Sequence, residues 1–321
     1  MSMFREVLSR EPGQPPQSGQ GYAYAIGWSC EGRLATGTST GWVLLSEVDG
    51  HGNSRVKSIF VAHGSKESVD AVAWHPSDSN QLATCSDKSL KVWDVRSTSK
   101  PAQVHKSDAE NFTVTYSPDG RYVALGSAKR EKNGTATDIL GIFDVRAKRK
   151  VRSVKFSFQM NAYKWSPNGE FIIVATEAGS IDVLASDKEV KLARVRSTSC
   201  AHAAPCKSLA LDPLNRRYAA SGGDDGLVAI WELDDFVCVR TIDVAGEARS
   251  MSFSADGRFL ATTTCEDAVE IAEVKTGAPA HSLRGDHLQA LAFSPTRPSL
   301  AGICARRRRG DFGLRLWSFV Y

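Results

Sequence analysis

One pattern of apolar and polar positions returns seven times along the chain. In each copy a short apolar run ends in an aromatic or large apolar residue, a turn of Ser, Pro, Asp, Asn or Gly follows, and further apolar runs come after it. Short apolar runs bounded by such turn residues are typical of β-strands, and no stretch has the length and period of a substantial helix. The first runs end 40–49 positions apart, at Trp28, Trp74, Tyr116, Trp165, Leu211, Phe253 and Phe293.

A repeat of about 40–45 residues that contains several strands and a Trp-Asp dipeptide is typical of a WD-repeat propeller blade. Trp93-Asp94 supplies such a dipeptide, and seven units of this size use nearly all of the 321 residues. The sequence therefore predicts an all-β fold, a single seven-bladed WD-repeat β-propeller, with its repeats in residues 22–321.

The last unit stops at its third apolar run, Leu314–Phe319. Because an unpaired edge strand invites pairing with other chains, we expect a fourth strand from elsewhere in the sequence. The apolar stretch Phe4–Leu8 is the candidate, so residues 1–10 are predicted to close the last blade. Residues 11–21, rich in Pro and Gly, are then the linker.

Two units carry a polar set at matching intervals. Unit two has His63, Thr84, Asp87 and Trp93, and unit five has His202, Ser221, Asp225 and Trp231. Imidazole, hydroxyl, carboxylate and indole groups can satisfy one another's hydrogen bonds inside a blade, which predicts two structural tetrads. A hydrolytic triad is the alternative, but a set that recurs in two blades indicates a repeat and not a catalytic site.

The net charge of +4 is mildly basic, so the placement of charge matters more than its total. The densest basic cluster lies in the hairpin between the second and third strands of the last unit and consists of four adjacent arginines, Arg306, Arg307, Arg308 and Arg309. The equivalent hairpin of unit three carries Lys129, Arg130 and Lys132, so both clusters are expected on one rim. We predict a weak contact there with RNA or an acidic partner segment; a merely solvated loop is the alternative.

Two further stretches have competing interpretations. Phe156 and Phe158 lie where the chain passes from unit three to unit four, either as a strand that packs on the next blade or as an exposed partner-binding patch. Cys200, His202 and Cys206 lack a fourth ligand for zinc, so no metal site is predicted. Because no activated nucleophile or phosphate-binding glycine loop stands out either, we expect no cofactor and no enzyme activity.

Several stretches resemble one family of WD-repeat proteins. They are Ser68–Ser77, Lys91–Thr98, Leu233–Arg240 and, in unit six, Ser250–Gly257 followed by Glu266–Gly277, where Ala272-Glu273 stands in place of Trp-Asp. In these stretches the chain resembles the THO complex subunit 3 family. The resemblance implies a nuclear, non-catalytic scaffold subunit of the THO part of the transcription-export complex, which supports mRNA-protein assembly and nuclear mRNA export. It also implies docking to the large helical THO scaffold subunit and other THO subunits, with no membrane and no small-molecule substrate.

A different class of function remains open. Trp93-Asp94-Val95-Arg96 fits the Trp-Asp-x-Arg box of substrate receptors in cullin-type ubiquitin ligases, and Phe143-Asp144-Val145-Arg146 is a degenerate second copy. An arginine at this position could bind a carboxylate of an adaptor protein. A reader of histone peptides is a third, broader option, because a propeller alone does not specify a function.

Overall fold

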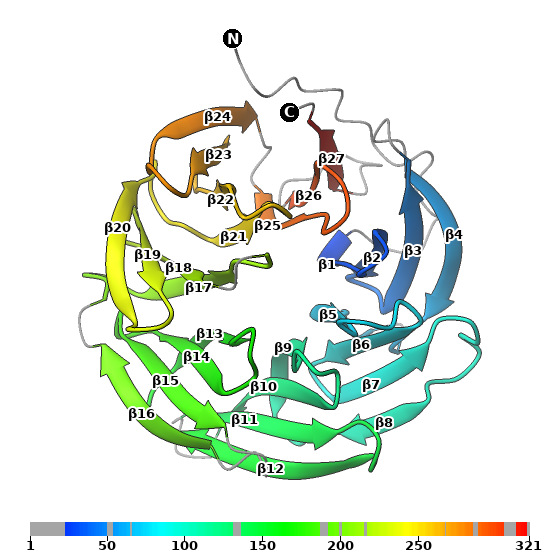
Figure 1. Ribbon diagram of the computed structural model, residues 1–321. Helices are drawn as coiled ribbons and strands as arrows, with labels where there is room; N and C mark the ends of the chain where they lie inside the picture. Colours follow the sequence, from blue (N-terminus) through cyan, green and yellow to red (C-terminus); the bar gives the residue numbers. More distant parts are fainter. Residues whose placement is uncertain are drawn as a thin grey trace.

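The structure is a computed structural model. It describes residues 23–49, 54–64, 66–130, 136–186, 192–198, 201–214, 217–266, 268–284, 288–304 and 313–319. Within these ranges every regular element is a β-strand, and the 27 strands form seven sheets arranged around an open centre (Figure 1). No helix in this part of the chain is long and apolar enough to cross a bilayer. The predicted seven-bladed β-propeller is confirmed.

The strands of each sheet follow one another from the centre of the ring outward. The inner strands are β1 (Ala23–Trp28), β5 (Ala71–Trp74), β9 (Glu110–Tyr116), β13 (Met160–Trp165), β17 (Cys206–Leu211), β21 (Ser250–Phe253) and β25 (Leu288–Phe293). The second strands are β2 (Arg33–Thr38), β6 (Gln81–Ser86), β10 (Tyr122–Arg130), β14 (Phe171–Thr176), β18 (Tyr218–Gly223), β22 (Phe259–Thr263) and β26 (Ser299–Cys304).

The third strands are β3 (Trp42–Val48), β7 (Ser89–Asp94), β11 (Ala136–Asp144), β15 (Ile181–Ser186), β19 (Leu227–Glu232), β23 (Ala268–Glu273) and β27 (Leu314–Ser318). The outer strands are β4 (Ser54–Val61), β8 (Gln103–Lys106), β12 (Arg149–Phe156), β16 (Leu192–Thr198), β20 (Val237–Asp243) and β24 (Pro279–Arg284). All neighbours along a sheet pair antiparallel, and we number the blades one to seven in chain order.

The seven residues that mark the sequence repeat are the last residues of the seven inner strands. The turn that follows is built the same way in several blades. In blade three the Ser117 hydroxyl donates to Asp119 Oδ1 at 2.5 Å and accepts from the Tyr122 backbone N–H at 2.9 Å. Gly120 has a φ of 71°, the left-handed conformation that glycine adopts without strain. The turn residues therefore fix where each inner strand ends.

The core lies between neighbouring blades. Trp74 of blade two is buried in one cluster with Ala25 and Phe60 of blade one, and its indole N–H donates to the Gly27 carbonyl oxygen at 3.0 Å. Blade one is joined to blade seven in the same manner, because Leu34 and Leu316 share a buried cluster. Each blade thus buries its apolar side chains only against its neighbours, so the ring must close for the core to be complete.

Blade seven has three strands among the described residues, β25, β26 and β27. The predicted closing strand in residues 1–10 and the linker in residues 11–21 lie outside the described part of the chain, and both stay predictions.

Candidate functional site

The polar set of blade five is a connected hydrogen-bond network. His202 Nε2 lies 2.8 Å from Ser221 Oγ, and Nδ1 lies 3.1 Å from Asp225 Oδ1. The Trp231 indole N–H donates to the same Ser221 hydroxyl at 2.8 Å. The Ala203 backbone N–H also donates to Asp225, at 2.9 Å. All four predicted side chains therefore meet, and the network ties the loop that carries His202 to the β18–β19 hairpin.

The corresponding set of blade two differs in one member. His63 Nε2 lies 2.9 Å from Thr84 Oγ1, to which the Trp93 indole N–H donates at 3.0 Å. The prediction of Asp87 as the fourth member is wrong. Asp87 is exposed, and His63 Nδ1 instead lies 3.2 Å from Ser89 Oγ. The hairpin of blade two has one residue less between the hydroxyl and the aspartate than the hairpin of blade five, so Asp87 does not reach the imidazole.

The two networks differ in their electrostatics. Burial, with a smaller contribution from Lys91, lowers the pKa of His63 to about 3, so its imidazole is neutral at physiological pH. Burial alone would raise the pKa of Asp225, but hydrogen bonds from Ala203 and His202 outweigh it, and the pKa is lowered. Blade five thus holds a carboxylate 3.1 Å from the histidine Nδ1, whereas blade two holds a hydroxyl at 3.2 Å and the carboxylate of Glu67 only at 4.0 Å.

The predicted basic rim is only partly visible in the structure. Lys129 and Arg130 lie in the paired part of β10, opposite Thr137 and Ala136, and not in an open loop. Lys129 Nζ lies 2.7 Å from Asp108 Oδ2, and Arg130 Nε lies 3.2 Å from Glu110 Oε2. These two cations are already paired with acidic side chains, which argues against an anion-binding patch formed by them.

The other members of the predicted rim lie outside the described residues, and their contact with RNA or an acidic segment stays a prediction. They are Lys132, Arg306, Arg307, Arg308 and Arg309.

Of the aromatic pair between blades three and four, Phe156 belongs to the core and Phe158 is half-buried against it. Phe156 is 7% exposed at the end of β12. Phe158 packs against the buried cluster that contains Phe156, and the centroids of the two rings are 5.0 Å apart. The interpretation of this pair as an exposed partner-binding patch is therefore wrong. A strand whose apolar residues pack on the next blade, the other interpretation, describes it.

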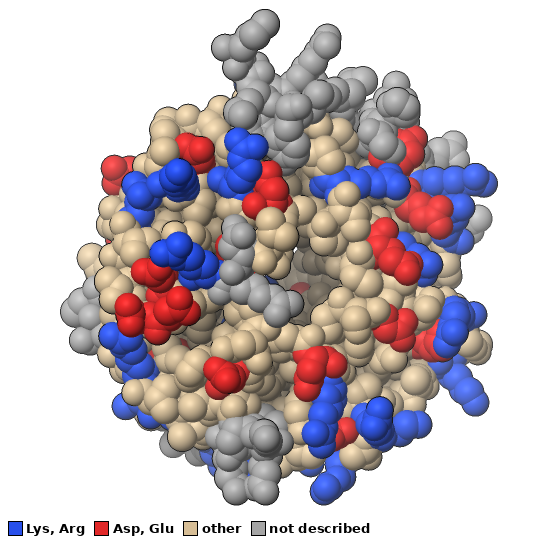
Figure 2. Space-filling view, in the orientation of Figure 1, with Lys and Arg blue, Asp and Glu red and all other residues tan. Residues whose placement is uncertain are grey.

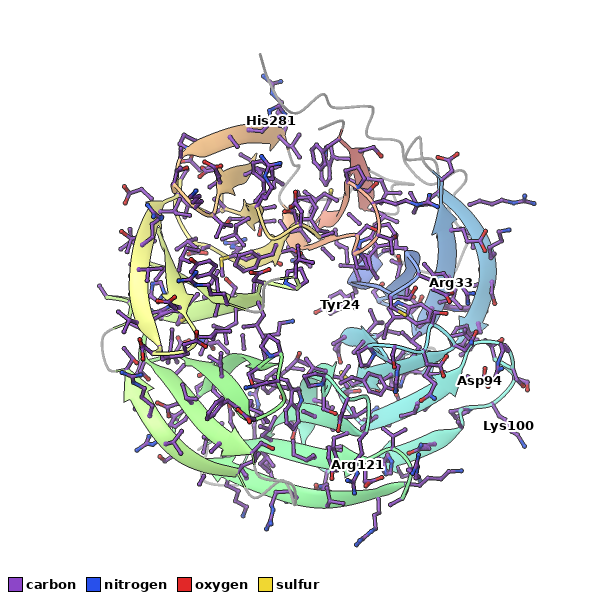
Figure 3. The ribbon with its side chains drawn as sticks, in the orientation of Figure 1. Tyr24, Arg33, Asp94, Lys100, Arg121 and His281 are labelled. Carbon is purple, nitrogen blue, oxygen red and sulfur yellow. The ribbon has the colours of Figure 1, made fainter. Side chains whose placement is uncertain are left out.

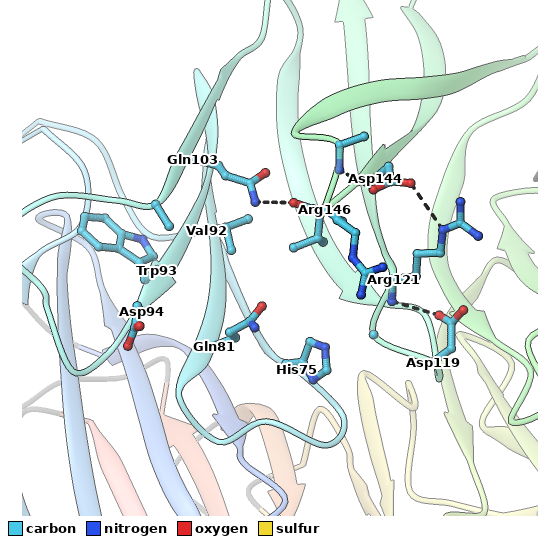
Figure 4. A pocket seen from close by; sticks show the side chains of 14 residues that line it. His75, Gln81, Val92, Trp93, Asp94, Gln103, Asp119, Arg121, Asp144 and Arg146 are labelled. Carbon is cyan, nitrogen blue, oxygen red and sulfur yellow. Dashed lines mark hydrogen bonds and ion pairs between the residues drawn. The ribbon is translucent and has the colours of Figure 1, made fainter.

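A groove of about 890 Å³ separates blades two and three (Figure 4). On the side of blade two it is bordered by the β5–β6 turn, β7 and the beginning of β8; on the side of blade three, by the β9–β10 and β11–β12 turns. Asp94 and Arg121 lie on these two neighbouring blades (Figure 3). The lining residues are His75, Gln81, Val92, Trp93, Asp94, Ala102, Gln103, Asp119, Gly120, Arg121, Asp144, Val145, Arg146 and Ala147.

The two arginines of the Trp-Asp-x-Arg boxes differ in their surroundings. Arg96 is bound to Asp94 of its own box, with Nε and Nη2 at 2.9 and 2.7 Å from the two carboxylate oxygens. Arg146 extends instead toward the middle of the groove (Figure 4). In the sequence Arg146 lies in a degenerate second copy of the box, and the pattern does not reveal which of the two arginines has a partner.

The face of the ring in view carries both signs of charge. Figure 2 shows Lys and Arg side chains interspersed with Asp and Glu side chains, without a broad field of one sign. Tyr24, 42% exposed, lies at the open centre of the ring (Figure 3). Among the described residues, which do not include Cys200, no group of three or more His, Cys, Asp or Glu side chains could hold a metal ion.

Two protein-family models match parts of the chain. The model "WD domain, G-beta repeat" matches residues 42–94, and the model "Cytochrome D1 heme domain" matches residues 165–312. The second range includes His202, whose two ring nitrogens are taken up by Ser221 and Asp225. This histidine does not fit axial ligation of a heme iron.

THO complex subunit 3 of Arabidopsis thaliana is 32% identical to the chain over 283 residues, which cover 87% of this chain and 84% of that protein. The chain belongs to the THO complex subunit 3 family. The Dictyostelium discoideum WD repeat-containing protein AAC3 is 28% identical to this family member, over 86% of the chain and 60% of that protein.

Among solved structures, the Myceliophteria thermophila Cps50 (Swd1) beta-propeller domain matches this THO complex subunit 3 family member with a TM-score of 0.76. The match covers 98% of the chain and 99% of that domain at 14% identity. At this identity the likeness shows the propeller fold and nothing about function.

Proposed function

We propose that this protein is a non-catalytic scaffold subunit of the THO part of the transcription-export complex, and that it supports mRNA-protein assembly and nuclear mRNA export. The observation that carries the proposal is the match to THO complex subunit 3 over 87% of this chain and 84% of that protein. The match spans most of the ring and not a single repeat, and it covers 84% of the relative's own length, compared with 60% for the WD repeat-containing protein AAC3.

The contacts of the blade-five network support a structural role for its residues. Ser221 is fully buried, and its hydroxyl already contacts the imidazole of His202 and the indole of Trp231. A catalytic serine needs a hydroxyl that a substrate carbonyl can reach, together with donors for the oxyanion. The buried Ser221 hydroxyl offers no such access, which favours a scaffold over a hydrolase.

The proposal includes the partners and the compartment. The large helical THO scaffold subunit and other THO subunits would bind the rims of the ring, in the nucleus. The run Arg306–Arg309 would add a weak contact with RNA or an acidic segment. Because four adjacent arginines release counterions when they bind a polyanion, that contact would weaken steeply with added salt.

Affinity purification of the tagged protein from nuclease-treated nuclear extract, followed by mass spectrometry, tests this function. Recovery of the large THO subunits in comparable amounts is the expected result, and nuclease treatment excludes bridging by RNA. Recovery of a cullin and its adaptor without THO subunits would contradict the proposal. The Arg96→Ala variant serves as a second readout, since a ligase adaptor that uses this box would be lost and THO subunits would not.

A further inference from the structure

Arg146 presents an unused guanidinium group in the groove between blades two and three. Its side chain extends toward the middle of the groove from the β11–β12 turn (Figure 4). Within the described part of the chain, no carboxylate or carbonyl oxygen lies within hydrogen-bond or ion-pair distance of this guanidinium. Arginine has five N–H donors in a planar fork that matches a carboxylate, so a ligand could form two parallel hydrogen bonds here.

The three carboxylates of the groove are already occupied. Asp94 is bound by Arg96, and Asp119 Oδ1 accepts from the Ser117 hydroxyl and from the backbone N–H of Arg121. Asp144 accepts from the backbone N–H of Ala147 at 2.7 Å and from Arg121 Nε at 3.4 Å. Each of these acidic groups thus has a donor of its own, and none of the three is paired directly with the Arg146 guanidinium.

Further donors and an apolar surface accompany Arg146. Arg121 contacts Asp144 through Nε, and its guanidinium lies 4.9 Å from the Tyr122 ring, which leaves its other N–H groups for a ligand. His75 Nδ1 accepts the backbone N–H of Asp78 at 3.0 Å, and the opposite edge of its ring packs against Gly120. The apolar lining is supplied by Val92, Ala102 and Val145.

From this arrangement we propose that the groove between blades two and three binds an extended acidic peptide segment of a partner protein, with a carboxylate of the segment paired to Arg146. The inference rests on the proposed scaffold role only in that a partner protein supplies the segment. To the scaffold role it adds which two blades bind the partner, which residue anchors the partner segment, and the chemistry of that segment. The apolar lining would contact the stems of its side chains.

The groove is less suited to RNA. Single-stranded nucleic acid is held by exposed aromatic rings on which bases stack, along a continuous basic track. The one indole in the lining, Trp93, is 2% exposed and hydrogen-bonded to Thr84. The face in view also alternates in charge (Figure 2). A short carboxylate-bearing segment anchored at Arg146 needs neither stacking rings nor a continuous basic track.

Fluorescence anisotropy with the purified full-length chain tests the proposal. The probe is a fluorescein-labelled peptide of alternating Glu and Ser, and its counterpart has Gln in place of Glu. We expect the acidic probe to bind and the Gln probe not to. Arg146→Gln should weaken binding about tenfold or more, and Arg146→Lys should fall between, because lysine keeps the charge and loses the fork. Arg149→Gln is the charge-matched control, an exposed residue beside the same turn that does not line the groove.

Three results would overturn the inference: equal binding of the acidic and Gln probes, equal losses for Arg146→Gln and Arg149→Gln, or tighter binding of single-stranded RNA or a phosphopeptide than of the acidic probe. Arg146 is exposed, so its variants should fold, and their melting temperatures check this. The assay contains no THO subunit. A negative peptide-binding result therefore does not affect the co-purification test of the scaffold role. A negative co-purification result likewise does not affect the peptide-binding result.

Discussion

The indole N–H of Trp28 donates to the carbonyl oxygen of Ala292 at 2.9 Å, across 264 residues of sequence. Trp28 ends the inner strand of blade one, and Ala292 lies in the inner strand of blade seven. This hydrogen bond therefore joins the first and the last blade near the centre of the ring. Trp74 makes the equivalent bond to Gly27, between blades two and one.

Trp28→Phe should destabilise the protein by about 0.5–1.5 kcal/mol, because the indole hydrogen bond to the carbonyl oxygen of Ala292 is lost. Trp165→Phe is the matched control. Trp165 ends the inner strand of blade four, is 6% exposed, and its indole N–H has no hydrogen-bond partner among the described residues. Urea unfolding of both variants checks this. Equal losses of stability would mean that the smaller size of the phenylalanine side chain, and not the lost hydrogen bond, decides the cost.

The two aspartates predicted as equivalent should respond differently to the same change. Asp225→Asn should cost about 1–3 kcal/mol, because the carboxylate accepts from His202 and from the Ala203 backbone. Asp87→Asn should stay within about 0.5 kcal/mol, as is usual for an exposed residue. The unfolding free energies at neutral pH decide between them. A large loss for Asp87→Asn would show that this residue does reach His63.

His63 should make the stability depend on pH. Its pKa is about 3 in the folded protein and 6.5 in the unfolded chain, so the unfolded state binds a proton first as the pH falls. The unfolding free energy should therefore decrease by up to about 1.4 kcal/mol per pH unit below 6.5, and recover above it.

The control for this pH dependence is His63→Asn, which removes the titrating group. The variant should be less stable at pH 7, since it loses contacts with Thr84 and Ser89. Its stability should nevertheless fall less steeply than that of the wild type between about pH 6.5 and pH 5. Parallel pH profiles for the two proteins would contradict a neutral, buried His63.

Deletion of residues 1–9 tests the predicted closure of blade seven. Strand β27 is buried as deeply as the third strands of other blades, with Trp317 1% exposed compared with 2% for Trp93 in β7. In blade two the outer strand β8 pairs with β7. If Phe4–Leu8 plays that part for β27, the deletion should lower the melting temperature by several degrees, through a lost strand and an exposed apolar edge. An unchanged melting temperature would refute this closure.

Local chemistry was enough to predict the repeating parts of the fold. The positions of Trp28, Trp74 and Phe253 mark strand ends correctly because apolar periodicity and turn residues act over a few neighbours. The blade-five tetrad was predictable for the same reason, since Asp225 lies in the hairpin that directly follows the strand of Ser221 and both contact His202. Asp87 was predicted wrongly because a hairpin shorter by one residue changes which side chain reaches the imidazole.

Contacts between blades were not predictable from the pattern. Phe156 is apolar in a connecting segment, and only the packing of blade four against blade three shows that it is covered. The groove depends on residues from two blades, and the availability of Arg146 depends on Asp144 being bound by Arg121 instead. A repeat pattern describes each unit separately, whereas such pairings are decided where two units meet.

The most direct test of the scaffold role is reconstitution from purified components. The nuclease-treated protein and the recombinant large helical THO subunit are mixed and analysed by size-exclusion chromatography with light scattering. We predict that the two co-elute as a complex of defined mass, with the propeller in a fixed ratio to the helical subunit. Separate elution of the two proteins at concentrations where other THO subunits associate would contradict the scaffold role.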